Sequence, residues 1–288
     1  MFLFKNRTRV IVVVIVFLLG FAFWLWQETS ARTQNLRVAF LDVGQGDAAL
    51  VLFPGGTQIL IDGGPDHSVL GELAAVMPPS DRTLELIVLT HPDADHLAGL
   101  LPVLERYRVE RILETGIRKD TALFRKFEAA LAREGAERIV AGQAMRLHIG
   151  KFAVFDVLWP QEAHDGEVID SPNNLGVVAR LQYGATSFLF PGDIEASTES
   201  KLVLCCKAML DADVLKAAHH GSKTSSFAQF LEAVTPDIVV LSVGKNNRYG
   251  HPHDTVVERL SGISHQIFRT DEHGVVVMES NGRAVMVR

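Results

Sequence analysis

Two histidines and two aspartates fall within one short stretch of the chain, Thr90-His91-Pro92-Asp93-Ala94-Asp95-His96. Imidazole nitrogens and carboxylate oxygens are common ligands of divalent metals, so four of them at this spacing favour a compact metal site. The alternative is an ordinary helix N-terminus, in which Asp93 caps the helix and Asp95 interacts favourably with its dipole. Four ligand-type side chains packed this closely favour the metal site.

The segments around this stretch indicate how it is positioned. An apolar run over 84–90 predicts a buried strand, and the run over 97–101 predicts the start of a helix. Four more loops follow apolar strands in the same way: Asp62-Gly63-Gly64, Pro191-Gly192-Asp193, His219-His220-Gly221-Ser222 and Tyr249-Gly250-His251-Pro252-His253. Taken alone, each of these loop sequences is often only a turn. If these strand ends share one sheet edge, their side chains converge on one site.

Length and composition indicate a globular chain. It has 288 residues, of which 48% are hydrophobic, enough for one large domain or two small ones. No linker divides 36–288, so we expect a single domain there. The formal charge of -6 argues against a generally basic protein that coats nucleic acid. It does not exclude a phosphodiester substrate, because bound cations offset local acidity.

Strand-like runs cluster at both ends of this domain, with helical periodicity between them. Strands are expected at 36–41, 48–53, 58–61, 84–90, 111–113, 151–158, 177–183, 186–190, 212–217 and 237–243, with short strands over 266–287. Helices are expected at 97–107, 121–134, 225–234 and 254–260. The pattern predicts an α/β protein with two β-sheets packed face to face and covered by helices.

The N-terminal region predicts export. A basic cytoplasmic segment, 1–9, precedes an uncharged apolar run over 10–26, and 27–35 forms a polar linker. The run is long enough to span a bilayer as one helix, and the preceding basic residues place the N-terminus in the cytoplasm. A signal peptide cleaved near Thr29-Ser30-Ala31 is the alternative, and a buried core helix is the third reading. Either of the first two places 36–288 outside the cytoplasm, anchored to the cell membrane or secreted.

The only cysteines, Cys205 and Cys206, are adjacent. Neighbouring cysteines rarely bridge each other, so we expect two unbridged residues in the core or at the edge of a helix.

Taken together, these motifs resemble the metallo-β-lactamase fold superfamily, whose H-x-H-x-D-H signature is met here by His91, Asp93, Asp95 and His96. The closer resemblance is to the extracellular metallo-β-lactamase-like domain of ComEC competence (DNA internalisation) proteins. It is carried by Phe40 to Ala48, Leu60 to Gly64, Asn173-Asn174 and the loops at 191–193, 219–222 and 249–253, and it spans nearly all of 36–288. The resemblance implies a four-layered αββα sandwich, preceded here by one transmembrane helix.

The resemblance also implies a centre for two divalent ions. Asp193 would bridge them, Asp95, His96 and His220 would hold one, and His91 with Asp93 would contribute to the other. Asn174 or Asn173 stands where many relatives have a further histidine. Because carboxylate and carbonyl oxygens suit harder ions than imidazole does, manganese is expected at least as much as zinc.

Further roles follow from the resemblance and from residue type. A metal-activated water would attack a phosphorus or carbonyl centre, so no serine or cysteine nucleophile is required. The expected catalytic residues are Asp95, Asp47, His219 and His251, and Asp62, Asn174 and His253 are expected in supporting positions. Candidate contacts for substrate phosphates are Lys216, Lys223, Lys245 and Arg248.

The leading interpretation is a membrane-anchored, metal-dependent phosphodiesterase or nuclease linked to DNA uptake, because the ComEC domain is thought to degrade one DNA strand during import. ComEC proteins also have a many-helix channel, so a role in uptake would require a channel partner here. The alternatives are a hydrolase of a small ester, lactam or phosphorylated metabolite, and a non-catalytic anchored binding module. The sequence does not predict the oligomeric state.

Overall fold

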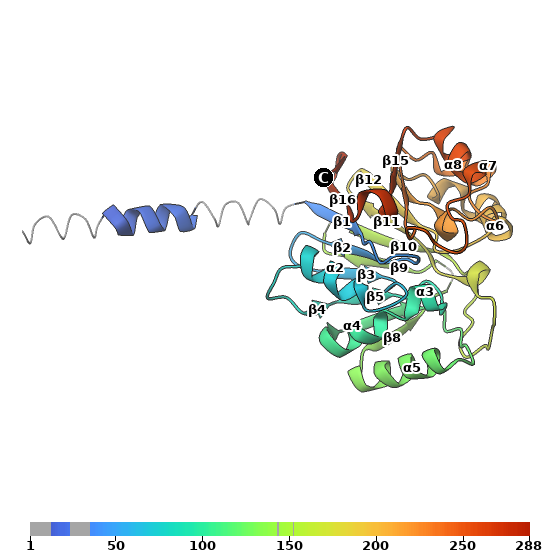
Figure 1. Cartoon of the computed structure of the whole chain (residues 1–288), viewed down its shortest axis with the longest axis horizontal. Helices are drawn as coiled ribbons and strands as arrows, with labels where there is room; N and C mark the ends of the chain where they lie inside the picture. Colours follow the sequence, from blue (N-terminus) through green and yellow to red (C-terminus); the bar gives the residue numbers. More distant parts are fainter. Residues whose placement is uncertain (1–12, 24–34, 143, 152) are drawn as a thin grey trace, which may run out of the picture.

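Two mixed β-sheets pack face to face in the described part of the chain, which comprises residues 13–23, 35–142, 144–151 and 153–288 of a computed structural model (Figure 1). The strand order is β17-β16-β1-β2-β3-β5-β7-β8 in the first sheet and β15-β14-β13-β12-β11-β10-β9 in the second. Buried apolar side chains from both sheets, including Phe40, Phe155 and Phe188, fill the space between them. The prediction of two sheets packed face to face is confirmed.

The strands are short. The first sheet contains β1 (Leu36–Phe40), β2 (Ala49–Leu52), β3 (Gln58–Ile61), β5 (Leu86–Val88), β7 (Arg111–Glu114), β8 (Glu137–Val140), β16 (Val276–Ser280) and β17 (Val285–Val287). The second contains β9 (Arg146–Ile149), β10 (Ala153–Trp159), β11 (Val178–Tyr183), β12 (Thr186–Phe190), β13 (Val214–Lys216), β14 (Ile238–Leu241) and β15 (Gln266–Arg269). A small two-stranded sheet pairs β4 (Thr83–Leu84) with β6 (Arg108–Val109).

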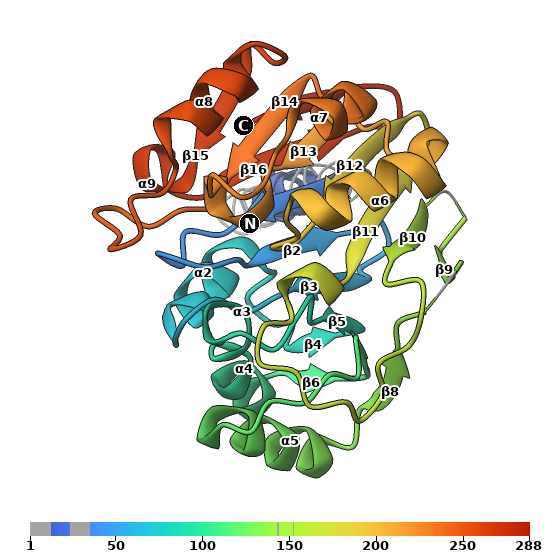
Figure 2. The ribbon, with the colours of Figure 1, turned by 90° about the vertical axis from the view of Figure 1, so that its right-hand side faces the viewer.

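Helices cover the outer face of each sheet (Figure 2). On the first sheet these are α2 (Ser68–Val76), α3 (Ala94–Leu97), α4 (Leu100–Arg106) and α5 (Ala122–Glu134). On the second they are α6 (Ala196–Cys206), α7 (Ala228–Val234) and α8 (Asp254–Ser261), and α9 (Thr270–His273) follows β15. The order of layers is therefore helix, sheet, sheet, helix.

The parallel part of each sheet determines where the motif loops lie. In the first sheet β3, β5 and β7 are parallel, and in the second β12, β13 and β14 are parallel. Parallel neighbours end at the same edge, so the loops that follow them gather there. The motif loops at 62–64, 90–96, 191–193, 219–222 and 249–253 all follow one of these strands.

The helix expected over 97–107 is interrupted at Gly99, between α3 and α4. A Cβ at position 99 would lie 1.8 Å from the carbonyl oxygen of Gly63, and the Gly99 N–H donates to the Gly64 carbonyl at 2.9 Å. Contact with the 62–64 loop therefore replaces a continuous helix. The sequence pattern also missed α2, α6, β8 and β9. Gly71 weakens the helical signal of α2, and charged residues occupy the two short strands.

Cys205 and Cys206 form a disulfide with each other, so the expectation of two unbridged cysteines is wrong. They occupy the last two positions of α6, where the Cys206 backbone already departs from helical geometry. This departure allows the two sulfur atoms to meet.

Residues 13–23 are helical. No helix in the described ranges combines the length and apolar character needed to cross a membrane. Residues 10–12 and 24–26 of the expected span lie outside the described residues, as do the expected basic segment 1–9 and residues 27–34 of the linker.

Candidate metal centre

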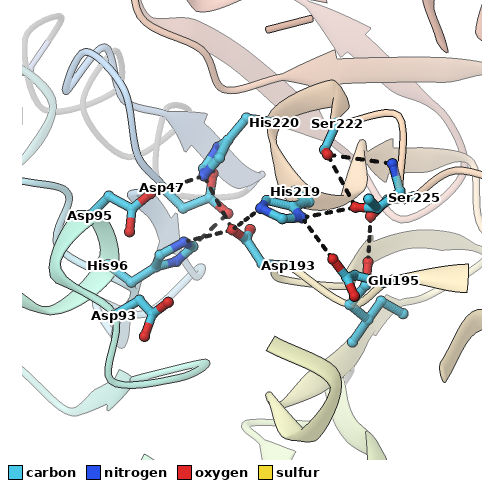
Figure 3. Close-up of polar contacts among 12 residues, drawn as sticks. Asp47, Asp93, Asp95, His96, Asp193, Glu195, His219, His220, Ser222 and Ser225 are labelled. Atoms are coloured by element: carbon cyan, nitrogen blue, oxygen red, sulfur yellow. Dashed lines mark hydrogen bonds and ion pairs between the residues drawn. The ribbon is translucent and has the colours of Figure 1, made fainter. Parts of the chain in front are cut away.

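Four metal-type side chains meet at the shared strand-end edge (Figure 3). Asp95 and His96 lie on α3, after β5 of the first sheet, whereas Asp193 follows β12 and His220 follows β13 of the second. Each contributes one ligand atom to a group whose members all lie within 4.8 Å of one another. The loops of both sheets thus form one cluster.

Asp193 lies at the centre of this cluster. Its Oδ2 atom is 3.3 Å from His96 Nε2 and 3.4 Å from His220 Nε2. His220 Nε2 also lies 3.5 Å from Asp95 Oδ2. Both Nε2 atoms are buried and have no hydrogen bond of acceptable geometry within the described part of the chain. Two unbonded imidazole nitrogens beside two carboxylates are a donor set that fits a divalent zinc or manganese ion.

The opposite edge of each imidazole is held by the protein. Asp62 accepts hydrogen bonds from His96 Nδ1 at 2.8 Å, from the Thr90 backbone N–H at 2.8 Å and from the Thr90 hydroxyl at 2.7 Å. His220 Nδ1 lies 2.9 Å from the Ser242 carbonyl oxygen, which can only accept. Hydrogen bonding at Nδ1 leaves the Nε2 lone pair directed at the cluster, as in carboxylate–histidine–metal arrangements. The sequence analysis did not predict that Thr90 and Ser242 help to orient the candidate ligands.

Asp47 lies behind the histidines, although it was expected to be catalytic. Its Oδ1 atom is 3.2 Å from His220 Nδ1, and its Oδ2 atom forms an ion pair with Lys216. Burial alone would raise the pKa of Asp47, but the positive charges of Lys216 and His220 keep it below its usual value. Asp47 therefore supports the ligands from the interior.

Lys216 cannot serve as the expected phosphate contact. Only 4% of this residue is exposed, and its ammonium group lies between Asp47 and Asp193, 3.8 Å from Asp193 Oδ1. It is the last residue of β13, so the strand directs it into the interior. Its role is to balance the charge of buried carboxylates.

The metal-free cluster is held together by charge. Burial alone would lower the pKa of His96, but the carboxylates of Asp193 and Asp62 raise it well above the usual value. The pKa of His220 is raised well above its usual value by Asp193 and Asp47 despite burial. In turn, these imidazoles hold the pKa of Asp193 well below its usual range, against the effect of burial. Without metal, these charges favour the protonated forms of His96 and His220.

His91 and Asp93 lie beside this cluster but are not among its four members. His91 is buried, its Nδ1 is 3.0 Å from the Thr90 hydroxyl, and its unbonded Nε2 is 3.8 Å from Asp93 Oδ2. The other oxygen of Asp93 pairs with Lys119 Nζ at 2.5 Å. The sequence analysis did not predict a role for Lys119, because an isolated lysine matches no motif.

The Asn174 amide is bonded elsewhere. Its Oδ1 accepts from the Glu195 backbone N–H at 3.0 Å, and its Nδ2 donates to Glu195 Oε2 at 3.0 Å. Both polar atoms are thus used in fixing the start of α6. The structure does not bring Asn174 into the metal cluster, so its expected contribution to a metal site is not supported.

Three further histidines lie toward the open side of the cluster. His219 Nε2 is 3.7 Å from Asp193 Oδ2, and its Nδ1 is 3.9 Å from Glu195 Oε1. The His251 ring is centred 5.8 Å from that of His219, and His253 lies farther along, 5.2 Å from His251. Burial, together with the positive charges of His220 and His219, lowers the pKa of His251 to about 4. His251 is therefore neutral at pH 7.

The remaining phosphate candidates, Lys223, Lys245 and Arg248, are exposed residues beside the motif loops. The Arg248 pKa is raised by its hydrogen bond to Tyr249 and also by the charge of Asp95.

Comparison with known proteins gives consistent results. The model of a family described as the metallo-beta-lactamase superfamily matches residues 41–245. ComE operon protein 3 of Bacillus subtilis (strain 168) is 32% identical over 259 residues, which cover 83% of this chain and 32% of that protein. Recombination protein 2 of Haemophilus influenzae is 30% identical over 266 residues, which cover 91% of this chain and 31% of that protein. The chain thus spans about a third of the length of these relatives.

Among solved structures, a mutant of the CmlA beta-hydroxylase matches with a TM-score of 0.54 and 13% sequence identity, covering 85% of this chain and 54% of that chain. At this identity the match shows the fold alone.

Proposed function

Because the chain belongs to the metallo-beta-lactamase superfamily, we propose that it is a metal-dependent hydrolase that cleaves phosphodiester bonds in nucleic acid. The observation that carries the proposal is the group formed by Asp95, His96, Asp193 and His220, with two buried imidazole nitrogens available to a metal ion. When bound, such an ion supplies an activated water and polarises the bond to be cleaved.

The chain's own residues divide into two sets around this group. Asp62 and the Ser242 carbonyl fix the imidazole ring orientations from the interior. On the open side, His219 lies 3.7 Å from Asp193 Oδ2 with part of its side chain exposed, so it can exchange protons with substrate or solvent. Neutral His251 beside it provides a hydrogen-bonding nitrogen without a charge.

A phosphodiester is supported by charge and by relatives. Lys119 pairs with Asp93, and Arg248 lies on the same loop as His251, so both cations are available near the acidic cluster to pair with a backbone phosphate. One relative is named Recombination protein 2, a name that fits a nucleic-acid substrate.

The direct test is cleavage of labelled single-stranded DNA by the purified protein with manganese or zinc. We expect Asp193→Ala and His220→Ala to lose both tightly bound metal and cleavage, because each removes a ligand from the central group. Asp120→Ala, an exposed carboxylate that pairs with Arg125, is the control and should retain both. Activity in both ligand variants would refute the proposed centre. Turnover of nitrocefin or acyl esters without DNA cleavage would favour a small-molecule substrate.

We further propose that residues 10–26 anchor the chain in the cell membrane, with 36–288 outside the cytoplasm. The apolar run behind basic residues supports this. Membrane fractionation combined with protease digestion of intact cells tests it. A protease-resistant protein in the soluble fraction would contradict it.

A further inference from the structure

Tyr249 lies exposed at the end of a row of aromatic rings that leads out of the candidate metal centre. The His220 and His251 rings are stacked with centroids 6.5 Å apart, and the His251 and Tyr249 rings are stacked with centroids 5.7 Å apart. Tyr249 retains 49% of its surface exposed despite this contact. A large aromatic surface is thus open to solvent two rings away from a candidate metal ligand.

The loop that carries Tyr249 is tightly held. Asn247 Oδ1 accepts the backbone N–H groups of Tyr249 at 3.1 Å and His251 at 3.0 Å. Asn247 Nδ2 donates to the carbonyl oxygens of Gly244 at 3.0 Å and His251 at 2.6 Å. The Gly244 N–H donates to Gln45 Oε1, which joins this loop to the first sheet. A partner that binds Tyr249 therefore meets a pre-organised loop, so less loop entropy is lost on binding.

Arg248 adds a positive charge beside the ring. Its Cζ atom lies 4.9 Å from the Tyr249 ring centroid, and its Nη2 donates to the phenol oxygen at 2.8 Å. The ring row relates this pair to the candidate metal centre, because His251 lies between Tyr249 and His220. A flat ring, a neighbouring cation and a metal centre match a planar base joined to phosphates.

We propose that Tyr249 is a stacking platform for a nucleobase of a single-stranded nucleic acid, with Arg248 pairing to an adjacent phosphate, an inference that rests on the proposed phosphodiesterase function. We propose a single strand rather than a duplex, because bases within a duplex are already stacked on their neighbours and offer no free face. Stacking depends on the ring rather than on base identity, so little sequence preference is expected.

The test is a binding titration by fluorescence anisotropy with the full-length protein in chelator, so that no cleavage occurs. The probes are an oligothymidylate and an abasic oligomer of the same length. Tyr249→Ala should weaken binding of the oligothymidylate by roughly 5- to 100-fold, the range for loss of one stacked base. Tyr249→Phe should bind like the wild type, and the abasic oligomer should bind both variants and the wild type equally.

Phe227 provides a matched control. It is also a partly exposed aromatic residue, 40% exposed, with the Arg259 Cζ atom 5.0 Å from its ring centroid, but it lies at the start of α7 outside the ring row. Phe227→Ala should leave oligothymidylate binding unchanged. Three results would each overturn the platform. In the first, Tyr249→Ala binds the oligothymidylate as tightly as the wild type. In the others, Tyr249→Ala loses as much affinity for the abasic oligomer as for the oligothymidylate, or Phe227→Ala loses as much affinity as Tyr249→Ala.

The two proposals fail in different ways. DNA cleavage with unchanged KM in Tyr249→Ala would remove the platform and leave the phosphodiesterase. Stacking-dependent binding without cleavage under any metal would remove the phosphodiesterase and leave a nucleic-acid-binding site.

Discussion

Replacing Asp62 by asparagine should weaken metal binding without removing any candidate ligand. Asparagine tolerates the left-handed backbone at this position, φ 57°, and its amide oxygen can still accept from Thr90. The charged acceptor for His96 Nδ1, at 2.8 Å, is lost. A hydrogen bond to a charged group contributes about 1.5 to 3 kcal/mol. Since about 1.4 kcal/mol corresponds to a tenfold change in affinity, the metal dissociation constant should rise roughly 10- to 100-fold.

The assay is competition between the protein and a chromophoric chelator for zinc or manganese. Asp81→Asn is the matched control, because Asp81 accepts a hydrogen bond from Gln58 at the start of β3, whereas Asp62 follows the end of that strand. The control should bind metal like the wild type. Far-ultraviolet circular dichroism of both metal-free variants verifies folding. Wild-type metal affinity in a folded Asp62→Asn variant would refute the assignment of Asp62 as the group that orients His96.

Two further outcomes follow from the buried charges. Lys216→Met should destabilise the protein by about 3 to 5 kcal/mol, because it leaves Asp47 buried without its cation. Thermal unfolding should show this loss, and the double variant with Asp47→Leu should recover much of it. Metal affinity should rise with pH through the raised pKa values of His96 and His220, since protons must leave first. In the metal-free protein these raised values contribute stability that is complete below the unfolded pKa of about 6.5 and is lost as pH rises through the folded values. Metal affinity independent of pH, or a metal-free melting temperature that climbs from pH 6 to 9, would contradict this account.

The positions of the motif loops were predictable because their signals are local. An apolar strand followed by Asp-Gly-Gly or His-His-Gly indicates a strand end whatever the rest of the chain does. Parallel strands then bring such ends to one edge, which is why these loops were expected to converge on one site. The pairing of Asp193 and His220 with His96 came from the family resemblance. The layered arrangement of two sheets was predictable for the same reason.

The roles that could not be predicted depend on contacts between distant segments. Lys216 lies within a motif region, but only the packing of β13 shows that its ammonium group meets Asp47 in the interior. The family resemblance predicted a ligand position at Asn174 or Asn173, yet the Asn174 amide is bonded to Glu195 on the loop before α6. The interruption at Gly99 likewise depends on a loop far away in sequence, so helical periodicity alone gives no sign of it.

The two halves of the sandwich contribute equally to the cluster, with Asp95 and His96 from one sheet and Asp193 and His220 from the other. An ion bound there would cross-link them, in addition to the apolar interior that already joins them. A ligand that binds only the folded state shifts the unfolding equilibrium in proportion to its free concentration. The supply of metal would then govern how long each folded molecule persists as well as how fast it works.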